Sequence, residues 1–151
     1  MTKLANNYVS IMEACASYVT NVKPDCNTPA TVYQILQPII NASTNNQQEA
    51  FYVIALDNKT RMLQAPVEVF KGVASACYIS AREIFQKALL MNAVSIIIAH
   101  NHPSGSLDPS SQDIAITRQI KEAGDIVGIR LLDHIVISKN GYMSFADMGM
   151  L

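Results

Sequence analysis

Two histidines and an aspartate have the residue types and the spacing of a metal site. His100 and His102 follow a strongly apolar stretch, and Asp113 lies eleven residues after His102. In an extended strand, residues two apart point to the same face and lie about 6.6 Å apart along the chain. The two imidazoles can therefore converge on one ion, and Asp113 can return to it from the first turn of a following helix. Two nitrogens, one oxygen and an open fourth position are typical of a catalytic zinc site.

The same residues also have ordinary structural uses. A single histidine after an apolar strand is more often a hydrogen-bonded core residue than a metal ligand. Ser110 and Asp113 have the spacing of a capping box, which would begin a helix whether or not a metal is bound. The combined spacing of the four residues His100, His102, Ser110 and Asp113, rather than any one of them, favours the metal site.

The full pattern is His-x-His, seven residues, Ser, two residues and Asp, running from His100 to Asp113. It resembles the motif of the JAMM metalloproteases, also called JAB or MPN+. The surrounding sequence resembles the JAB domain of the RadC family in particular, over about Glu49 to Leu151. The stretches that carry this resemblance are His100–Gly105, Pro109-Ser110, Thr117 and Leu132–Ile135.

The resemblance implies a role for each matching residue. His100, His102 and Asp113 match the zinc ligands of the family. Ser110 matches the serine whose hydroxyl stabilises the tetrahedral intermediate, and Glu49 matches the glutamate that activates the attacking water. The implied activity is that of a zinc-dependent hydrolase, a metalloprotease that cleaves a peptide or isopeptide bond in a peptide or protein substrate.

The resemblance also implies a fold. The JAB/MPN fold belongs to the α/β (α+β) class and consists of a mixed β-sheet flanked by helices, with an architecture similar to that of cytidine deaminases. We expect residues 45–151 to form this domain and residues 1–44 to form a helical extension that packs on it.

Other ionisable residues are weaker candidates for these roles. Glu68 and Glu83 are alternatives to Glu49, but Glu83 has the spacing of a capping partner and Glu68 lies where the family has no catalytic residue. His134 follows Asp133 in an apolar segment, and either residue could form a hydrogen bond to one of the metal ligands. A core histidine that is satisfied by Asp133 is the favoured interpretation of this pair.

The expected elements follow from apolar periodicity and from turn residues. Thr28 and Pro29 form a cap and first-turn pair, Gly124 can end a helix, and Asn140-Gly141 is a strong hairpin turn. We expect helices over residues 4–19, from 29 to about 39, from 81 to about 91 and from about 110 to 124. We expect strands over residues 49–56, 61–70, 94–99, 129–138 and 142–145, with a polar loop over 41–48.

Composition excludes several classes of protein. The chain has 151 residues, of which 50% are hydrophobic and 15% charged, with a formal net charge of -1. This excludes a disordered chain and a strongly basic nucleic-acid binder. The longest apolar stretch, 94–99, is too short to span a bilayer, and we find neither a signal-peptide core nor a C-x-x-C pair. We therefore expect a cytoplasmic protein with reduced thiols and no membrane partner, and leave a homo-oligomer open.

Two other functions compete with the hydrolase. A non-catalytic JAB module could bind a protein partner in a DNA-repair or DNA-processing context. Full-length RadC proteins carry a helix-hairpin-helix region whose turn needs Gly-x-Gly, however, and there is no glycine before Gly72. A nuclease or deaminase is the third class, but the deaminase signature of His-x-Glu with Pro-Cys-x-x-Cys is absent.

Overall fold

The structure is a computed structural model that describes residues 23–44, 47–72 and 79–151. The helix expected over residues 4–19 lies outside these residues. So do Cys15 and Cys77, two of the three cysteines that we expect to be reduced. The described helices are α2 (Pro29–Thr44), α3 (Ala81–Leu90) and α4 (Ser111–Val127). The strands are β1 (Glu49–Leu56), β2 (Val67–Gly72), β3 (Ser95–Asn101), β4 (Arg130–Ser138) and β5 (Gly141–Ser144).

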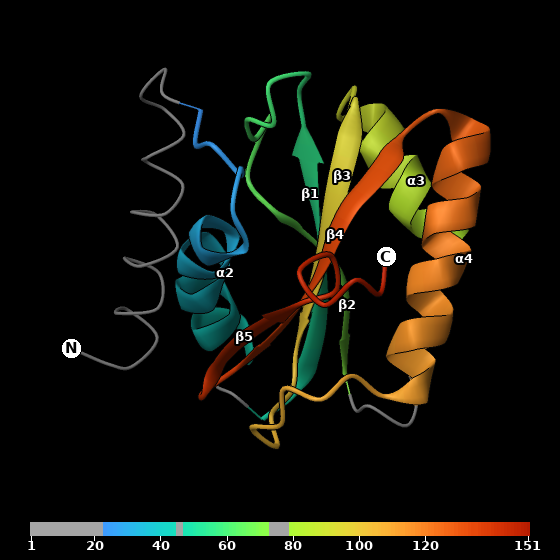
Figure 1. The fold of residues 1–151 in the computed structure, drawn as a ribbon. Helices are drawn as coiled ribbons and strands as arrows, with labels where there is room; N and C mark the ends of the chain where they lie inside the picture. The colour runs from blue at the N-terminus through green and yellow to red at the C-terminus, as the bar shows by residue number, and fades with distance from the viewer. Residues whose placement is uncertain (1–22, 45–46, 73–78) are drawn as a thin grey trace.

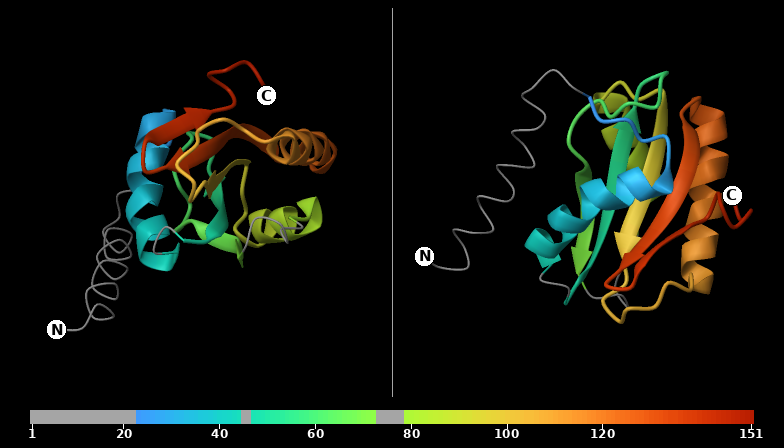
Figure 2. Two further views of the ribbon diagram at one scale, coloured as in Figure 1. Left: turned by 90° about the horizontal axis from the view of Figure 1, so that it is seen from below. Right: turned by 60° about the vertical axis from the view of Figure 1, so that its left-hand side comes forward.

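The five strands form one mixed sheet in the order β2-β1-β3-β4-β5. β1 is antiparallel to both of its neighbours, β3 and β4 are parallel, and β4 and β5 form an antiparallel hairpin. The parallel pair needs a crossover, which α4 provides. Figure 1 shows the sheet between its helices, with α2 on one side and α3 and α4 on the other, and Figure 2 shows the same layers from below. The α+β fold class and the mixed sheet are confirmed.

Each face of the sheet has its own apolar core. Tyr52 and Ile97 pack on the α2 side, whereas Phe51 and Ile98 pack on the side of α3 and α4. Both faces of β1 and β3 are covered, which explains why these strands are apolar throughout. Successive residues of β1 therefore alternate between the two cores, and Glu49 shares its face with Phe51.

Helix α2 is longer than the sequence predicts. Its apolar stripe continues past Pro38, because Ile40 and Thr44 are buried against the sheet like Val32 and Leu36 before them. Residues 41–44 are consequently helical, and the expectation of a loop beginning at residue 41 is wrong. Burial of this four-residue repeat outweighs the polar composition of the segment.

Helix α4 ends at a different glycine from the one expected. Gly124 lies inside the helix, and Gly128 is the C-cap, with φ 80° in the left-handed region. Gly124 has another use: a Cβ on it would lie 2.5 Å from the carbonyl oxygen of Ile129. The glycine thus lets the chain that enters β4 pass close to the helix.

The second expected strand also begins later than predicted. Arg61 and Met62 form isolated bridges, with Asp25 and Leu56 respectively, and β2 starts only after Pro66. Proline has no N–H to donate to a strand ladder, so the regular pairing begins after it. The strand over residues 49–56 and the hairpin through Asn140-Gly141 are confirmed.

Candidate metal centre

The candidate centre lies where β3 ends and α4 begins. His100 is the sixth residue of β3, and His102 follows the strand with its amide N–H donating to the carbonyl of Ile137 at 2.8 Å. The loop then folds back, with the amide of Gly105 donating to the carbonyl of His102 at 3.1 Å. Gly105 has φ 92°, which favours glycine, and its own carbonyl accepts a 2.8 Å bond from Asn140. The loop thereby places the first turn of α4 beside the two histidines.

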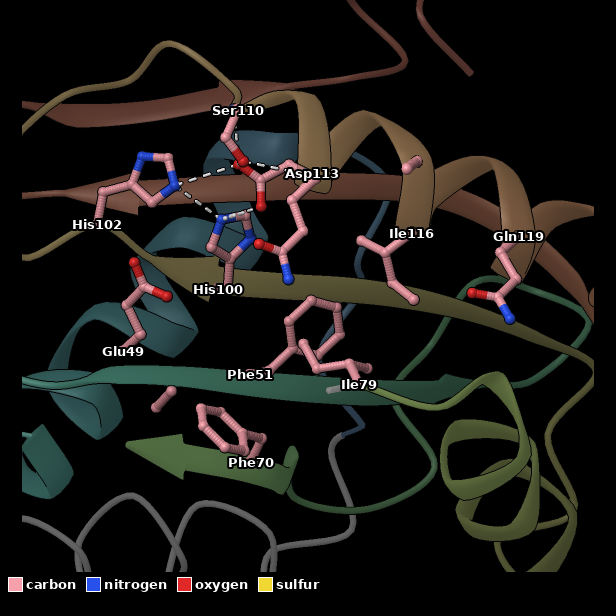
Figure 3. A pocket seen from close by; sticks show the side chains of 13 residues that line it. Glu49, Phe51, Phe70, Ile79, His100, His102, Ser110, Asp113, Ile116 and Gln119 are labelled. Carbon is pink, nitrogen blue, oxygen red and sulfur yellow. Dashed lines mark hydrogen bonds and ion pairs between the residues drawn. The ribbon is translucent and has the colours of Figure 1, made fainter. Parts of the chain in front are cut away.

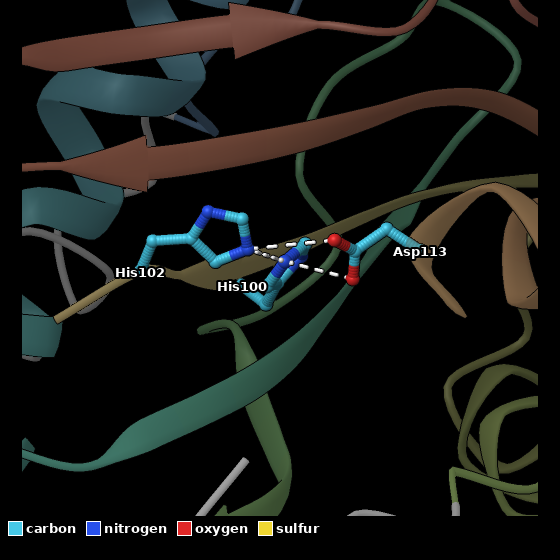
Figure 4. A group of neighbouring side chains, drawn as sticks. All are labelled: His100, His102 and Asp113. Carbon is cyan, nitrogen blue, oxygen red and sulfur yellow. Dashed lines mark hydrogen bonds and ion pairs between the residues drawn. The ribbon is translucent and has the colours of Figure 1, made fainter. Parts of the chain in front are cut away.

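Three side chains meet at this point (Figure 4). The Nε2 atoms of His100 and His102 are 2.9 Å apart. The carboxylate of Asp113 lies 3.2 Å from Nε2 of His100 and 3.4 Å from Nε2 of His102. Ligand atoms around a tetrahedral zinc ion, at bond lengths of about 2.0–2.1 Å, are separated by about 3.3 Å. The two distances to Asp113 end on different oxygens, Oδ1 for His100 and Oδ2 for His102, but all three separations are close to this value, so the three side chains could share one ion.

A chain of buried hydrogen bonds behind His100 fixes which of its nitrogens carries the proton. Thr117 donates its hydroxyl proton to the carbonyl of Asp113 at 2.6 Å, so it can only accept from Nδ1 of His134, 2.5 Å away. The His134 ring is fully buried, and burial lowers its pKa well below the usual value, so it is neutral. Its Nε2 must then accept from Nδ1 of His100, at 2.8 Å. Nε2 of His100 is left with a lone pair that points toward Asp113.

The same reasoning applies to His102. Its Nδ1 lies 3.1 Å from the carbonyl of Ser106, which can only accept, so Nδ1 carries the proton. When the ring is neutral, its Nε2 is therefore also an acceptor. One nitrogen of each imidazole and one oxygen of the carboxylate thus lie within 4.8 Å of one another, so the three side chains could hold one metal ion. The donor set fits a divalent ion such as zinc.

The pKa values at the centre reflect this crowding of acceptors. Burial would raise the pKa of Asp113, but its interactions with the two nearby imidazoles, His100 and His102, outweigh burial and lower the pKa far below its usual range. The hydrogen bond to Asp113 raises the pKa of His102 against the effect of burial, with a smaller contribution from the charge of Glu49. Both pKa shifts show that positive charge is favoured beside the carboxylate of Asp113.

Ser110 and Asp113 also form the capping box that their spacing predicts. The hydroxyl of Ser110 accepts from the amide of Asp113 at 3.1 Å, and Oδ2 of Asp113 accepts from the amide and hydroxyl of Ser110 at 2.7 and 2.6 Å. Oδ1 of Asp113 remains directed at His100. Oδ2 also lies 3.4 Å from Nε2 of His102, so Oδ1 is the oxygen that the capping box leaves free to bind a metal ion.

A cavity of about 390 Å³ opens beside the three side chains. Glu49 lies on its wall at the start of β1, across from Ser110 and Asp113 at the start of α4 (Figure 3). Glu49 is 51 positions before His100, yet the pairing of Phe51 with His100 brings it to the same end of the sheet. The five residues that the sequence places in the site, Glu49, His100, His102, Ser110 and Asp113, all line this cavity.

Sequence reasoning missed the rest of the cavity. Its apolar wall is formed by Phe51 and Phe70 on the strands, Ile79 ahead of α3 and Ile116 on α4, and Gln119 lies further along (Figure 3). Helical spacing from Asp113 could have indicated Ile116 and Thr117, one turn along the same helix. Phe70 has no local sequence signal, since its pairing with Phe51 in the sheet brings it to the cavity. Ile79 lies outside the strands, just before α3, and has no such signal either.

The alternative residues have other contacts. Glu68 accepts from Ser43 and from Tyr52 at 2.6 and 2.9 Å, and Glu83 lies exposed in the first turn of α3. Asp133 accepts from the hydroxyl of Ser144 and from two backbone amides, one of them that of His134. The expectation that Asp133 satisfies the His134 ring is therefore wrong, because that ring bonds to Thr117 and His100 instead.

Comparison with known proteins agrees with this geometry. The model of the RadC-like JAB domain matches residues 26–150. A UPF0758 protein of Pelobacter propionicus is 45% identical over 105 residues, which are 70% of this chain and 45% of that protein. A UPF0758 protein of Rubrobacter xylanophilus is 37% identical over 129 residues, which are 85% of this chain and 55% of that protein. The chain thus spans about half the length of the curated relatives it matches.

Among the described helices, none combines the length and the apolar character that a bilayer crossing requires. The site geometry and the match over residues 26–150 lead to one assignment. This chain belongs to the family of RadC-like JAB domains.

Proposed function

We propose that this chain is a zinc-dependent hydrolase of the JAMM type, which cleaves a peptide or isopeptide bond. One observation carries the proposal: the acceptor atoms of His100, His102 and Asp113 converge at a cavity that also holds Glu49 and Ser110. Three protein ligands leave a fourth position for water or substrate, which distinguishes a catalytic zinc site from a structural one.

A bound zinc ion would supply Lewis-acid chemistry, lowering the pKa of a water ligand to about 7 and polarising the substrate carbonyl. The protein supplies the proton transfers. Glu49 accepts a proton from the attacking water and delivers it to the leaving nitrogen as the C–N bond breaks. The position of Glu49 on the cavity wall, opposite the start of α4, supports this role.

Ser110 supplies a hydrogen bond to the developing oxyanion. In the metal-free protein its hydroxyl is 2.6 Å from Asp113. Ser110 lines the cavity, where a hydroxyl donor would stabilise the negative charge of the transition state. His134 and Thr117 act behind the ligands by keeping the lone pair of His100 directed at the ion.

The proposed substrate is a peptide or protein segment that enters the cavity along its apolar wall. Phe51, Phe70 and Ile116 provide that wall. The formal net charge of -1 supports neither a strong affinity for nucleic acid nor electrostatic steering toward it.

The test combines metal analysis with one conservative substitution. Wild-type protein and Glu49→Gln are loaded with zinc and assayed on a quenched fluorogenic peptide library and on a lysine isopeptide. Exposed Glu122→Gln on α4 makes the same chemical change away from the cavity and is the control. We expect both variants to keep one zinc and only Glu49→Gln to lose hydrolysis, by roughly a hundredfold or more.

Two results would contradict the proposal. Hydrolysis that survives Glu49→Gln would remove Glu49 from the mechanism. A wild-type chain that folds and binds no zinc would instead favour a non-catalytic JAB module that binds a protein partner.

A further inference from the structure

Asn101 lies between the two histidines in the sequence, but its side chain forms hydrogen bonds with the backbone at the start of β1. The residue is 3% exposed. Its Oδ1 accepts a hydrogen bond from the amide of Ala50 at 2.8 Å, and its Nδ2 donates to the carbonyl of Gln48 at 2.9 Å. One carboxamide therefore binds the backbone on both sides of Glu49.

The two hydrogen bonds of the Asn101 side chain lie just beyond the last regular pair between β1 and β3. The pairing of β1 with β3 runs from Leu56–Ser95 to Phe51–His100 and ends there. The main chain of Asn101 pairs with Ile137 in β4 instead. On the opposite edge of β1, Glu49 and its neighbour are paired with β2. The carboxamide of Asn101 is thus what ties the first residues of β1 to β3.

We propose that Asn101 is a positioning residue that holds Glu49 in the register which directs its carboxylate into the metal cavity. The inference rests on the proposed function, since it concerns the base of that reaction. The physical reason is the two-residue period of a strand, in which a slip by one residue moves every side chain to the opposite face. A slip here would turn Glu49 toward α2 and place Gln48 or Ala50 on the metal face.

The choice of asparagine follows from the two partners. An amide N–H needs an acceptor and a carbonyl needs a donor, and a carboxamide offers both within one planar group. An aspartate would set a negative oxygen against the carbonyl of Gln48, and alanine would remove the partner of the buried Ala50 amide and of the partly buried Gln48 carbonyl. Asparagine is therefore suited to this position for a reason separate from metal coordination.

The first test uses the metal-free full chain, so that it does not depend on catalysis. Hydrogen exchange of the Ala50 amide and ¹³C relaxation of the Glu49 side chain are measured in wild type, Asn101→Ala and Asn101→Ser. The serine variant keeps a polar group and serves if alanine prevents folding. Thr44→Ala, a buried polar residue of α2, is the control. We expect Ala50 exchange about tenfold faster or more in the Asn101 variants alone, as one hydrogen bond is lost.

The second test separates positioning from general stability. Zinc affinity is measured for each variant, and kcat and KM are measured on the fluorogenic peptide that the wild-type protein cleaves fastest. We expect Asn101→Ala to keep zinc affinity and KM while kcat falls roughly tenfold to a hundredfold. In a Glu49→Gln background the same substitution should cause no further loss, because both changes act through one carboxylate.

Unchanged exchange at Ala50 and unchanged Glu49 mobility in both Asn101 variants would overturn the inference. So would a kcat loss that persists in full in the Glu49→Gln background. Failure of the proposed function is a different result, since it appears in the wild type as absent zinc binding or absent hydrolysis, while the exchange experiment still decides the role of Asn101.

Discussion

Nε2 of His134 lies 2.8 Å from Nδ1 of His100, so a fully buried histidine controls the position of the proton on a buried histidine of the metal site. The His134 ring is stacked on Phe145, with centroids 4.7 Å apart, and its other nitrogen is held by Thr117. This ring has one tautomer available, and His100 must adopt the complementary one. The orientation of a ligand lone pair is thereby fixed by residues that do not touch the ion.

The first prediction concerns this hydrogen-bond chain. Thr117→Val removes the acceptor of the His134 proton while keeping the shape of the side chain. Loss of such a residue behind a ligand lowers metal affinity by about 10–100-fold, and we expect that range for zinc, measured by competition with a chromophoric chelator. Thr44→Val is the matched control, because Thr44 is equally buried and also donates to the carbonyl four residues earlier. Equal zinc affinities for both variants would exclude the proposed control of His100.

The second prediction separates the two roles of Ser110. Ser110→Ala removes a helix cap and should lower the free energy of unfolding by about 1 kcal/mol in urea titrations. It should also lower kcat by about 10²–10³ if the hydroxyl stabilises the oxyanion. Ser80→Ala removes the cap of α3, where the side chain accepts from the amide of Arg82, and should affect stability only. Identical kinetic behaviour of the two variants would leave Ser110 a purely structural residue.

The third prediction compares two glycines of α4. Gly124→Ala forces a methyl group to within 2.5 Å of a backbone oxygen and should cost about 2 kcal/mol of stability despite the better helix propensity of alanine. Gly128→Ala meets no atom within 4 Å, but it keeps φ 80°. Left-handed strain alone should cost about 1 kcal/mol. Urea unfolding measures both losses, and we expect the loss for Gly124→Ala to be the larger. If the helix could shift away from Ile129, the loss for Gly128→Ala would be the larger instead.

The fourth prediction uses the buried carboxyl of Asp133. Burial raises its pKa, against hydrogen bonds from Ser144 and from the amides of Ala146 and His134, and with a smaller effect of Asp147 in the same direction as burial. Because the folded pKa lies above the unfolded one, the native state binds more protons between them. Stability should therefore fall as the pH rises from about 4, the unfolded pKa, through the folded pKa.

Asp133→Asn should remove this decrease of stability with rising pH. The amide can still accept from the two backbone groups and can bond to Ser144, so the fold is retained. The measurement is the difference in unfolding free energy between wild type and variant from pH 4 to pH 7, with exposed Asp125→Asn as control. A difference that stays constant with pH would show that Asp133 ionises as easily in the folded chain as in the unfolded one.

Local spacing predicted the part of the site that is local in the chain. His100, His102 and Asp113 lie within one strand, one loop and one helical turn, so their separation along the sequence limits their separation in space. Glu49 needed the family resemblance, because only the pairing of Phe51 with His100 brings β1 to the metal end of β3. The alternation of a strand predicts that Asn101 faces away from the two histidines, but its partners could not be predicted, since both are backbone atoms in or just before that distant strand.

The errors in element boundaries have a common cause. Pro38 and the polar residues after it are typical of a helix end, and Gly124 is typical of a C-cap. In the folded protein, Thr44 is buried on the sheet and Gly124 packs against the entry to β4. Tertiary contacts determined both boundaries, and such contacts leave no periodic signal in one sequence.

The most direct test of the account is X-ray absorption at the zinc edge of the zinc-loaded full chain. We predict one zinc ion with four ligands, two of them imidazole nitrogens at about 2.0–2.1 Å and the others oxygens, with no sulfur. His102→Ala should lower the imidazole count by one. Sulfur ligation, an all-oxygen shell, or the same two imidazoles in His102→Ala would contradict the claim that His100, His102 and Asp113 hold the metal.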